Sequence, residues 1–220
     1  MRIAQIAPLT EAVPPKLYGG TERVIAWLTE ELVALGHDVT LFASGDSHTS
    51  ARLEAIWPRA LRLDTSVRDP MGLHMAMLEQ VRRQSDQFDV LHFHLDYYPF
   101  SLFSRQTTPF ITTLHGRLDL PEHQPVFTTF SSMPVISISN SQRRPVPQAG
   151  WVKTIYHGLP ADLLTPSPCD PVISHSWAAY RRRNRSIAQS GSPSGVAFRS
   201  RSRPRSTGLT GTISRSRSAR

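Results

Sequence analysis

Apolar residues in the first part of the chain form two short dense runs with a helix-spaced stripe between them. Residues 2–7 are mostly apolar, as is typical of a strand covered on both faces of a parallel sheet. The stripe has three- and four-residue spacing and predicts an amphipathic helix that ends at Gly36 in the left-handed conformation. Its members are Val24, Ile25, Leu28, Leu32 and Leu35. Residues 38–43 predict the next strand, which completes a right-handed crossover unit.

The alternation of strands and helices continues to about residue 160. Further strands are predicted at 88–94, 109–116, 133–139 and 151–160. A helix is predicted to start at Pro70 and to end at Arg82 and Arg83. Its apolar stripe consists of Met71, Leu73, Met75, Met77, Leu78 and Val81. Residues 51–58 predict an edge strand or hairpin, and 97–105 a short aromatic helix. The pattern therefore predicts an α/β fold with one doubly wound parallel sheet.

Two glycines, Gly19 and Gly20, lie between the first strand and the first helix. Glycine lets the backbone approach a ligand and point its N–H groups outward at a helix N-terminus, which suits a phosphate or a sugar hydroxyl. Thr21 is predicted to cap the helix, with Glu22 complementing its positive end. The spacing is not G-x-G-x-x-G, so it is no dinucleotide fingerprint, and an ordinary strand-to-helix turn stays an alternative.

Histidines follow the ends of two later strands. His92 and His94 point to the same face of their strand, and we favour neutral, hydrogen-bonded core histidines over a metal-binding pair. His115 and Gly116 end the next strand, at the edge where open α/β sheets bind ligands. A histidine satisfied by a backbone carbonyl is the alternative for His115. The position at the strand end favours the functional interpretation.

The last two strands also end in polar residues. Asn140 and Ser141 are predicted to cap a helix after the strand at 133–139, with side chains free to reach a ligand. Pro145 and Pro147 are expected to cut that helix short. The strand at 151–160 repeats the His-Gly ending at residues 157 and 158. Because the strands are parallel, all these ends are predicted to line one edge of the sheet.

Length and composition narrow the class of protein. The 220 residues suffice for one α/β domain with a substantial core but not for two. The sequence has no run of eighteen apolar residues and no basic-then-apolar leader, so we expect a cytoplasmic protein. Cys169 is the single cysteine, which argues against a disulfide framework and a zinc cluster.

The net charge of +8 is concentrated in the last fifty residues. Residues 1–170 hold 14 Lys and Arg against 17 Asp and Glu, whereas residues 171–220 hold 11 Arg, 12 Ser and no acidic residue. Such a composition cannot bury enough apolar surface to fold. We therefore predict a folded domain over 1–165 and a linker with a disordered Arg/Ser-rich tail over 166–220.

Five segments, taken together, resemble one family. They read LYGGTERV, DVLHFHLD, TLHG, ISISNSQR and VKTIYHGLPADLL. Their order and spacing are similar to the amino-terminal half of retaining glycosyltransferases of family 4, which have the GT-B fold, near the branch of avilamycin-type enzymes. The resemblance covers residues 1 to about 168.

The resemblance implies transfer of a sugar from a nucleotide-diphosphate sugar to a glycan or small-molecule acceptor. It places His115 beside the transferred sugar as the catalytic residue. The implied substrate-binding residues are Gly19, Gly20, Thr21, His94, Asp96, Gly116, Asn140, His157 and Gly158. The resemblance implies neither a metal nor another cofactor, and no nucleic-acid partner. Peripheral membrane contact and the oligomeric state stay open.

The family's second half, which supplies basic groups and a carboxylate pair, has no counterpart in residues 171–220. Read from the third base of the Pro171 codon, the permitted codons also encode the expected opening of that half, and Trp177 followed by Ala178 forces a glycine there. We therefore expect a frameshifted tail and a truncated chain with little or no transferase activity.

Two other functions stay open. A nucleic-acid-associated protein would use the arginines of the tail to bind phosphates. These are Arg201, Arg203, Arg205, Arg215 and Arg217. The body offers neither a basic face nor an RNA-binding aromatic signature, which argues against this function. The other alternative is a GT-B epimerase or a sugar-nucleotide binding module without catalysis.

Overall fold

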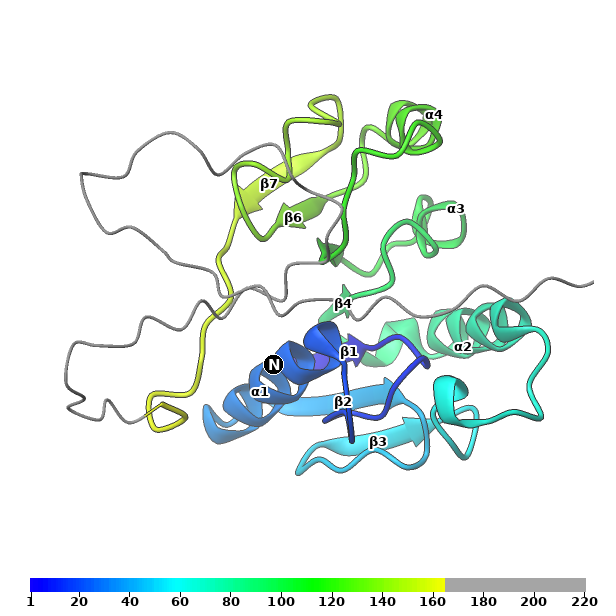
Figure 1. Cartoon of the computed structure of the whole chain (residues 1–220), viewed down its shortest axis with the longest axis vertical. Coiled ribbons are helices and arrows are strands. Elements are labelled where there is room, and N and C mark those ends of the chain that lie inside the picture. Colours follow the sequence, from blue (N-terminus) through cyan, green and yellow to red (C-terminus); the bar gives the residue numbers. More distant parts are fainter. Residues whose placement is uncertain (165–220) are drawn as a thin grey trace, which may run out of the picture. The chain divides into compact units, whose positions relative to one another are not determined.

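The computed structural model describes residues 1–164, and seven parallel strands form one sheet within them (Figure 1). The strands are β1 (Arg2–Ile6), β2 (Asp38–Ala43), β3 (Arg52–Ala55), β4 (Val90–Phe93), β5 (Phe110–Leu114), β6 (Val135–Ser137) and β7 (Trp151–Thr154). Their spatial order is β3-β2-β1-β4-β5-β6-β7. The chain thus leaves β1 first in one direction and later in the other, which confirms the doubly wound, Rossmann-like sheet.

Helices cover both faces of this sheet. They are α1 (Gly20–Ala34), α2 (Pro70–Arg83), α3 (Phe100–Phe103) and α4 (His123–Thr129), with 3-10 turns η1 (Leu61–Leu63) and η2 (Ser85–Gln87). Ile25 of α1 packs with Leu41 on one face. Leu78 of α2 packs with Ile6 and Phe93 on the other. Figure 1 shows α1 lying along β1 and β2.

The sequence misplaced the start of α1 and parts of two apolar stripes. The carbonyl of Gly19 accepts the first helical bond, from Arg23 N at 3.1 Å, so Gly19 rather than Thr21 is the N-cap, without a side-chain cap. Leu35 is 66% exposed because α1 has already ended, and Gly36 has the expected positive φ of 81°. On α2, Met71 and Met75 are exposed, because the helix turns His74 and Met77 towards the sheet instead.

The region after β6 forms turns where a helix was predicted. Asn140 and Ser141 therefore cap nothing. Gln142 takes over the local hydrogen bonds, because its amide oxygen accepts from Ile138 N at 2.9 Å and its Nε2 donates to Leu114 O at 2.9 Å. These bonds tie the end of β6 to the end of β5 and compete with helical geometry.

Residues 52–55 confirm the predicted edge strand and pair parallel to β2, which excludes the hairpin alternative. The expected disordered tail over 166–220 lies outside the described residues. No helix within residues 1–164 has the length and apolar character needed to cross a membrane.

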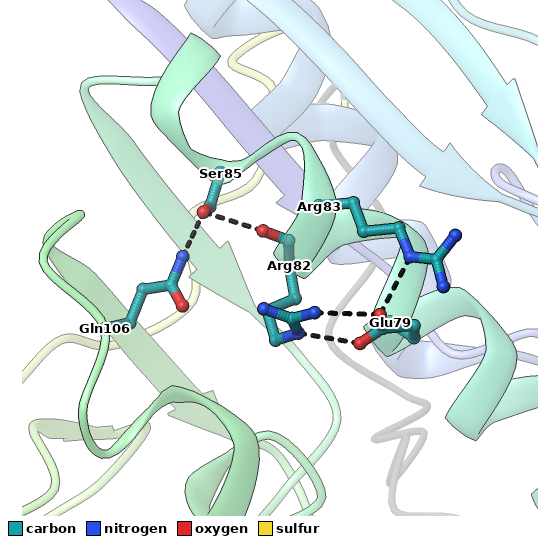
Figure 2. Close-up of polar contacts among 5 residues, drawn as sticks. All are labelled: Glu79, Arg82, Arg83, Ser85 and Gln106. Atoms are coloured by element: carbon teal, nitrogen blue, oxygen red, sulfur yellow. Dashed lines mark hydrogen bonds and ion pairs between the residues drawn. The ribbon is translucent and has the colours of Figure 1, made fainter.

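Charged side chains pair with one another at the amino-terminal edge of the sheet. The α2 helix ends there, where Glu79 bonds Arg82 at 2.7 Å and Arg83 at 2.8 Å (Figure 2). Nearby, Ser85 accepts from the Gln106 side chain and donates to the Arg82 carbonyl at 2.9 Å. The polar groups at this end of α2 therefore satisfy one another.

Candidate functional site

A cleft of about 540 Å³ opens at the carboxyl ends of β1, β4 and β5. This is the point where the strand order reverses, the usual ligand site of an open α/β sheet. Eight of the residues predicted from the sequence line it, and they are Gly19, Gly20, Thr21, His94, Asp96, His115, Gly116 and His157. The prediction that the glycine pair and His115 share one sheet edge is thus confirmed.

The loop from β1 to α1 forms a fixed wall of the cleft. Leu9 N donates to His74 Nε2 at 3.2 Å, which ties the loop to α2. Val13 N donates to Ser47 Oγ at 2.9 Å, which ties it to the end of β2. Arg62 of η1 lies 3.0 Å from Glu11 Oε1 and donates to the Tyr18 carbonyl at 3.3 Å. These contacts hold the glycine turn in place.

A residue larger than glycine at position 19 would have to displace its neighbours. A Cβ at this position would lie 2.8 Å from Glu22 Oε2 and 2.8 Å from Pro15 Cβ, well inside van der Waals contact. The missing side chain lets the Glu22 carboxylate fold back over the start of α1. Because Thr21 is not the cap, its hydroxyl is left for the cleft.

Glu22 is a buried carboxylate in the wall of the cleft. Its side chain is 6% exposed and accepts no hydrogen bond from another residue within 1–164. Burial raises the pKa of Glu22, its own backbone amide lowers it, and the negative charge of Glu11 raises it further. Glu11 is 1% exposed, and its Oε2 has no partner among the described residues.

A hydrogen-bonded chain runs from Gln5 through His94 to His115. His94 Nε2 lies 2.8 Å from Gln5 Oε1, and because an amide oxygen only accepts, this nitrogen carries the proton. Neutral His94 then accepts through Nδ1 from His115 Nε2–H at 2.8 Å. His115 is therefore left with a bare lone pair on Nδ1, which is buried and has no partner among the described residues.

The side-chain amide of Gln5 also determines the tautomer of His92. Gln5 Nε2 donates to His92 Nδ1 at 3.3 Å, so His92 Nε2–H donates to Thr113 Oγ1 at 2.8 Å. Burial lowers the pKa of His92 to about 4 and of His115 to about 3, and that of His94 well below its usual range. The three rings are therefore neutral at pH 7, as predicted for His92 in β4 and for His94 directly after it. Among the described residues no group of His, Cys, Asp or Glu could hold a metal.

Asp96 and His157 complete the lining. Asp96 has a φ of 48°, in the left-handed region, and its carboxylate makes no hydrogen bond within residues 1–164. The surrounding protein raises the pKa of Asp96, although nearby His123 lowers it. His157 stacks on His115 with ring centroids 5.2 Å apart. Burial lowers the pKa of His157 as well.

Two predicted substrate-binding residues do not reach the cleft. Asn140 is exposed in the turns after β6, where the helix expected to position it does not form. Gly158 lies in the extended segment after β7, one residue beyond the ring that stacks on His115. Asn140 is therefore outside the candidate site, whereas Gly158 directly follows the lining residue His157 without lining the cleft itself.

Comparison with protein families decides the relationship. Residues 18–148, more than half of the chain, match the profile of Glycosyltransferase Family 4. The chain belongs to glycosyltransferase family 4. This family segment contains the glycine turn, the ends of β4 and β5, and Asn140, whereas the His-Gly ending of β7 lies beyond it. A comparison with curated proteins finds no match.

Solved structures similar to this family 4 chain include three enzymes. A glycosyltransferase involved in avilamycin A biosynthesis is 22% identical, with 66% of this chain and 38% of that chain covered, at a TM-score of 0.41. Sucrose-phosphate synthase from Thermosynechococcus elongatus is 14% identical (70% and 47% covered, TM-score 0.49). A glycosyltransferase from Rickettsia africae is 18% identical (75% and 46% covered, TM-score 0.48). The chain spans less than half the length of each.

Sequence reasoning missed four residues that shape the site of this family 4 domain, which are Gln5, Glu11, Arg62 and His74. Gln5 and His74 each interrupt an apolar pattern, and a polar residue at a buried position signals a specific partner. Glu11 and Arg62 lie in irregular segments, and only the tertiary structure brings them together. No local sequence pattern predicts such a pair.

Proposed function

We propose that residues 1–164 supply the acceptor-side half of a retaining glycosyltransferase that uses a nucleotide-diphosphate sugar. The observation that carries this proposal is the cleft at the strand reversal, which gathers the glycine turn and His115 in a chain of family 4. The transferred sugar and a hydroxyl of a glycan or small-molecule acceptor would meet in this cleft. Backbone N–H groups of Gly19 and Gly20, and the Thr21 hydroxyl, are close enough to the opening to orient them.

His115 contacts the transferred sugar in this proposal as a neutral ring. A histidine with a pKa of about 3 is unprotonated at pH 7, so it contributes hydrogen bonding and shape rather than an acidic proton. Departure of the diphosphate needs positive groups, and the only guanidinium in the described lining, that of Arg62, is already paired with Glu11. Stabilisation of the leaving group therefore falls to residues outside 1–164.

The test combines binding and turnover on the whole chain. The isotope-labelled protein is titrated with a panel of UDP-, GDP- and dTDP-sugars and of free sugars, while backbone amide shifts are recorded. We expect the amides of Gly19, Gly20 and Gly116 to shift, and His115→Ala to reduce this response while the protein stays folded. The matched control is His37→Ala, remote from the cleft at the end of α1. Responses confined to other residues contradict the proposal.

Turnover in the same samples tests whether the cleft serves glycosyl transfer. Mass spectrometry of acceptor panels detects products that carry the transferred sugar. Product that disappears in His115→Ala supports glycosyl transfer. Binding at the cleft without product for any donor and acceptor pair fits the binding-module alternative and equally a transferase that lacks its second half.

A further inference from the structure

We infer that the cleft selects a ligand that donates hydrogen bonds and carries no negative charge, namely an uncharged or amine-bearing polyol, with Glu22 as the specificity-determining carboxylate. The inference rests on the proposed function, because it names the class of acceptor that the cleft would take. Four observations lead to it: the state of Glu22, the charges of the lining, the neutral histidines, and the start of α1.

Within the described residues the buried carboxylate of Glu22 is bonded only by its own backbone amide, which leaves further acceptor capacity unused. Glu22 is 6% exposed and accepts from no other residue within 1–164. Buried polar groups without a partner are rare, because each loses its hydration without compensation. The carboxylate lies in the lining of the cleft, so a ligand there can supply the missing donors. Hydroxyl and ammonium groups donate, whereas phosphate and carboxylate groups only accept.

The charges of the lining favour the same class of ligand. Its charged residues are Glu22, Asp96 and Arg62. The Arg62 guanidinium already lies 3.0 Å from Glu11 Oε1, so its charge is compensated. Glu22 and Asp96 form no ion pair among the described residues, although the charge of Arg62 lowers the pKa of Glu22 and that of His123 lowers the pKa of Asp96. A negatively charged ligand in this cleft is repelled, and a cationic one is attracted.

The histidines add no positive charge to balance the carboxylates. His94, His115 and His157 line the cleft, and each has a pKa below its usual value. A second proton on His94 would sit on Nδ1 and face the Nε2–H of His115, so these hydrogen bonds require a neutral His94, whereas burial lowers the pKa of His115 to about 3. The geometry therefore keeps this wall uncharged at neutral pH.

The N-terminus of α1 does not offset the negative charge of the cleft lining either. A helix N-terminus attracts anions through its free N–H groups and its dipole. Here Glu22 occupies the first turn, with its carboxylate folded over Gly19. The positive end of α1 therefore already faces a negative charge, so the glycine turn suits a hydroxyl better than a phosphate.

The experiment compares three sugars that differ in one charged group. The labelled chain is titrated with D-glucose, D-glucosamine and D-glucuronate at pH 7, and the shifts of the Gly19, Gly20 and Gly116 amides give the affinities. We expect glucosamine to bind most tightly and glucuronate at least about tenfold more weakly than glucosamine. Raising the salt concentration should narrow this difference, because it screens the charges.

Substitutions assign the preference to Glu22. Glu22→Gln keeps the shape of the side chain and removes its charge, so it should reduce the glucosamine-to-glucuronate ratio about threefold or more. The matched control is Glu31→Gln, which removes an exposed carboxylate from the same helix and should leave the ratio unchanged. If Glu22→Gln does not fold, Asp96→Asn, at an exposed position of the lining, is expected to lower the ratio in the same direction.

The outcomes distinguish this inference from the proposed function. Equal affinity for the three sugars, or tighter binding of glucuronate, overturns the charge selectivity and leaves the cleft as a sugar site. If Glu22→Gln leaves the ratio of glucosamine affinity to glucuronate affinity unchanged, the role assigned to Glu22 is overturned. If no sugar and no nucleotide sugar shifts the cleft amides, the proposed function fails together with the inference.

Discussion

The two edges of the sheet use their polar residues in opposite ways. At the amino edge, Arg2 bonds Asp89 at 2.7 Å, and both side chains are exposed. Glu79 bonds Arg82 and Arg83 in the same way (Figure 2). At the carboxyl edge, the buried carboxylate of Glu22 is bonded only by its own backbone amide, and His115 Nδ1 has no partner within the described residues. The amino edge is saturated, whereas the carboxyl edge keeps unused hydrogen-bonding capacity.

This difference separates a structural edge from a candidate binding edge. Exposed ion pairs contribute little to stability, and their groups need no ligand to complete their hydrogen bonds. Buried groups without partners lower stability, and a ligand that satisfies them recovers that loss. Substitutions at the carboxyl edge should therefore change both stability and binding, whereas those at the amino edge should change neither by much.

The largest expected effect comes from Gln5→Leu. This substitution keeps the approximate volume but leaves the His94 Nε2–H and the His92 Nδ1 lone pair without partners in the interior. We expect the free energy of unfolding to fall by about 2 to 4 kcal/mol, because two buried polar groups lose their hydrogen bonds. Urea denaturation at pH 7.5 measures this change.

Ring-nitrogen NMR then tests the tautomers in the same protein. In the wild type, His94 and His115 should both carry the proton on Nε2. Gln5→Glu is the matched variant, because its carboxylate still accepts from His94 but favours the charged ring and should raise the pKa of His94. Wild-type rings with the proton on Nδ1 would contradict the derived chain of hydrogen bonds.

Acid should destabilise the fold through the same histidines. The pKa of His92 is lowered to about 4 and that of His115 to about 3, whereas an unfolded histidine titrates near about 6.5. Below that value the unfolded chain binds more protons, so this contribution to stability is complete above about pH 6.5 and is lost as the pH falls. Each ring contributes at most about 1.4 kcal/mol per pH unit, or about 2 kcal/mol between pH 6.5 and 5.

Urea denaturation at several pH values measures that slope. Carboxylates also begin to titrate near pH 5, so the informative quantity is the difference between the wild type and His92→Gln. The variant should lose less stability between pH 6.5 and 5, because it has one fewer depressed histidine. Parallel curves for the two proteins would show that His92 does not contribute.

The glycine turn gives an effect of intermediate size on stability. In Gly19→Ala the new Cβ meets Glu22 Oε2 and Pro15 Cβ, both at 2.8 Å, so the carboxylate or the loop must move. We expect a loss of about 1 to 3 kcal/mol, the usual cost of overpacking, and a clear loss of sugar binding. Gly20→Ala is the control for stability, because a Cβ there meets nothing within 4 Å. Equal effects of the two substitutions would contradict the role assigned to Gly19.

The fold was predictable from the sequence because parallel strands leave a strong pattern. Strands buried on both faces read as apolar runs, and residues 38–43 match β2 in full. The failures came where side chains compete with local preference. Asn140 is a good helix cap in isolation, but Gln142 bonds to the ends of β5 and β6 and the segment forms turns. Such tertiary competition leaves no local sequence signal.

The candidate site was predictable only in part for a related reason. Strand topology alone places His94 and His115 at the carboxyl edge. The hydrogen bond from Leu9 N to His74, and the pairing of Glu11 with Arg62, join segments that are 65 and about 50 residues apart. Gln5 stood in a strand pattern as a single polar residue, and its role became visible only with the rings around it.

The smallest effect is expected at the amino edge, from Glu79→Gln. In the wild type, hydrogen bonds from Arg82 and Arg83 lower the pKa of Glu79 to about 2. The substitution removes the charge that pairs with these two arginines. These side chains are exposed to water, where ion pairs are screened by salt and oppose the entropy of flexible side chains. We therefore expect the urea midpoint at pH 7.5 to shift only slightly, and the shift to vanish in high salt.

Sugar binding at the cleft should be unchanged, because α2 carries Glu79 to the edge of the sheet opposite the cleft. A loss of sugar binding in Glu79→Gln comparable to that in Glu22→Gln would mean that the two edges are coupled, and the division between a saturated edge and a binding edge would then fail.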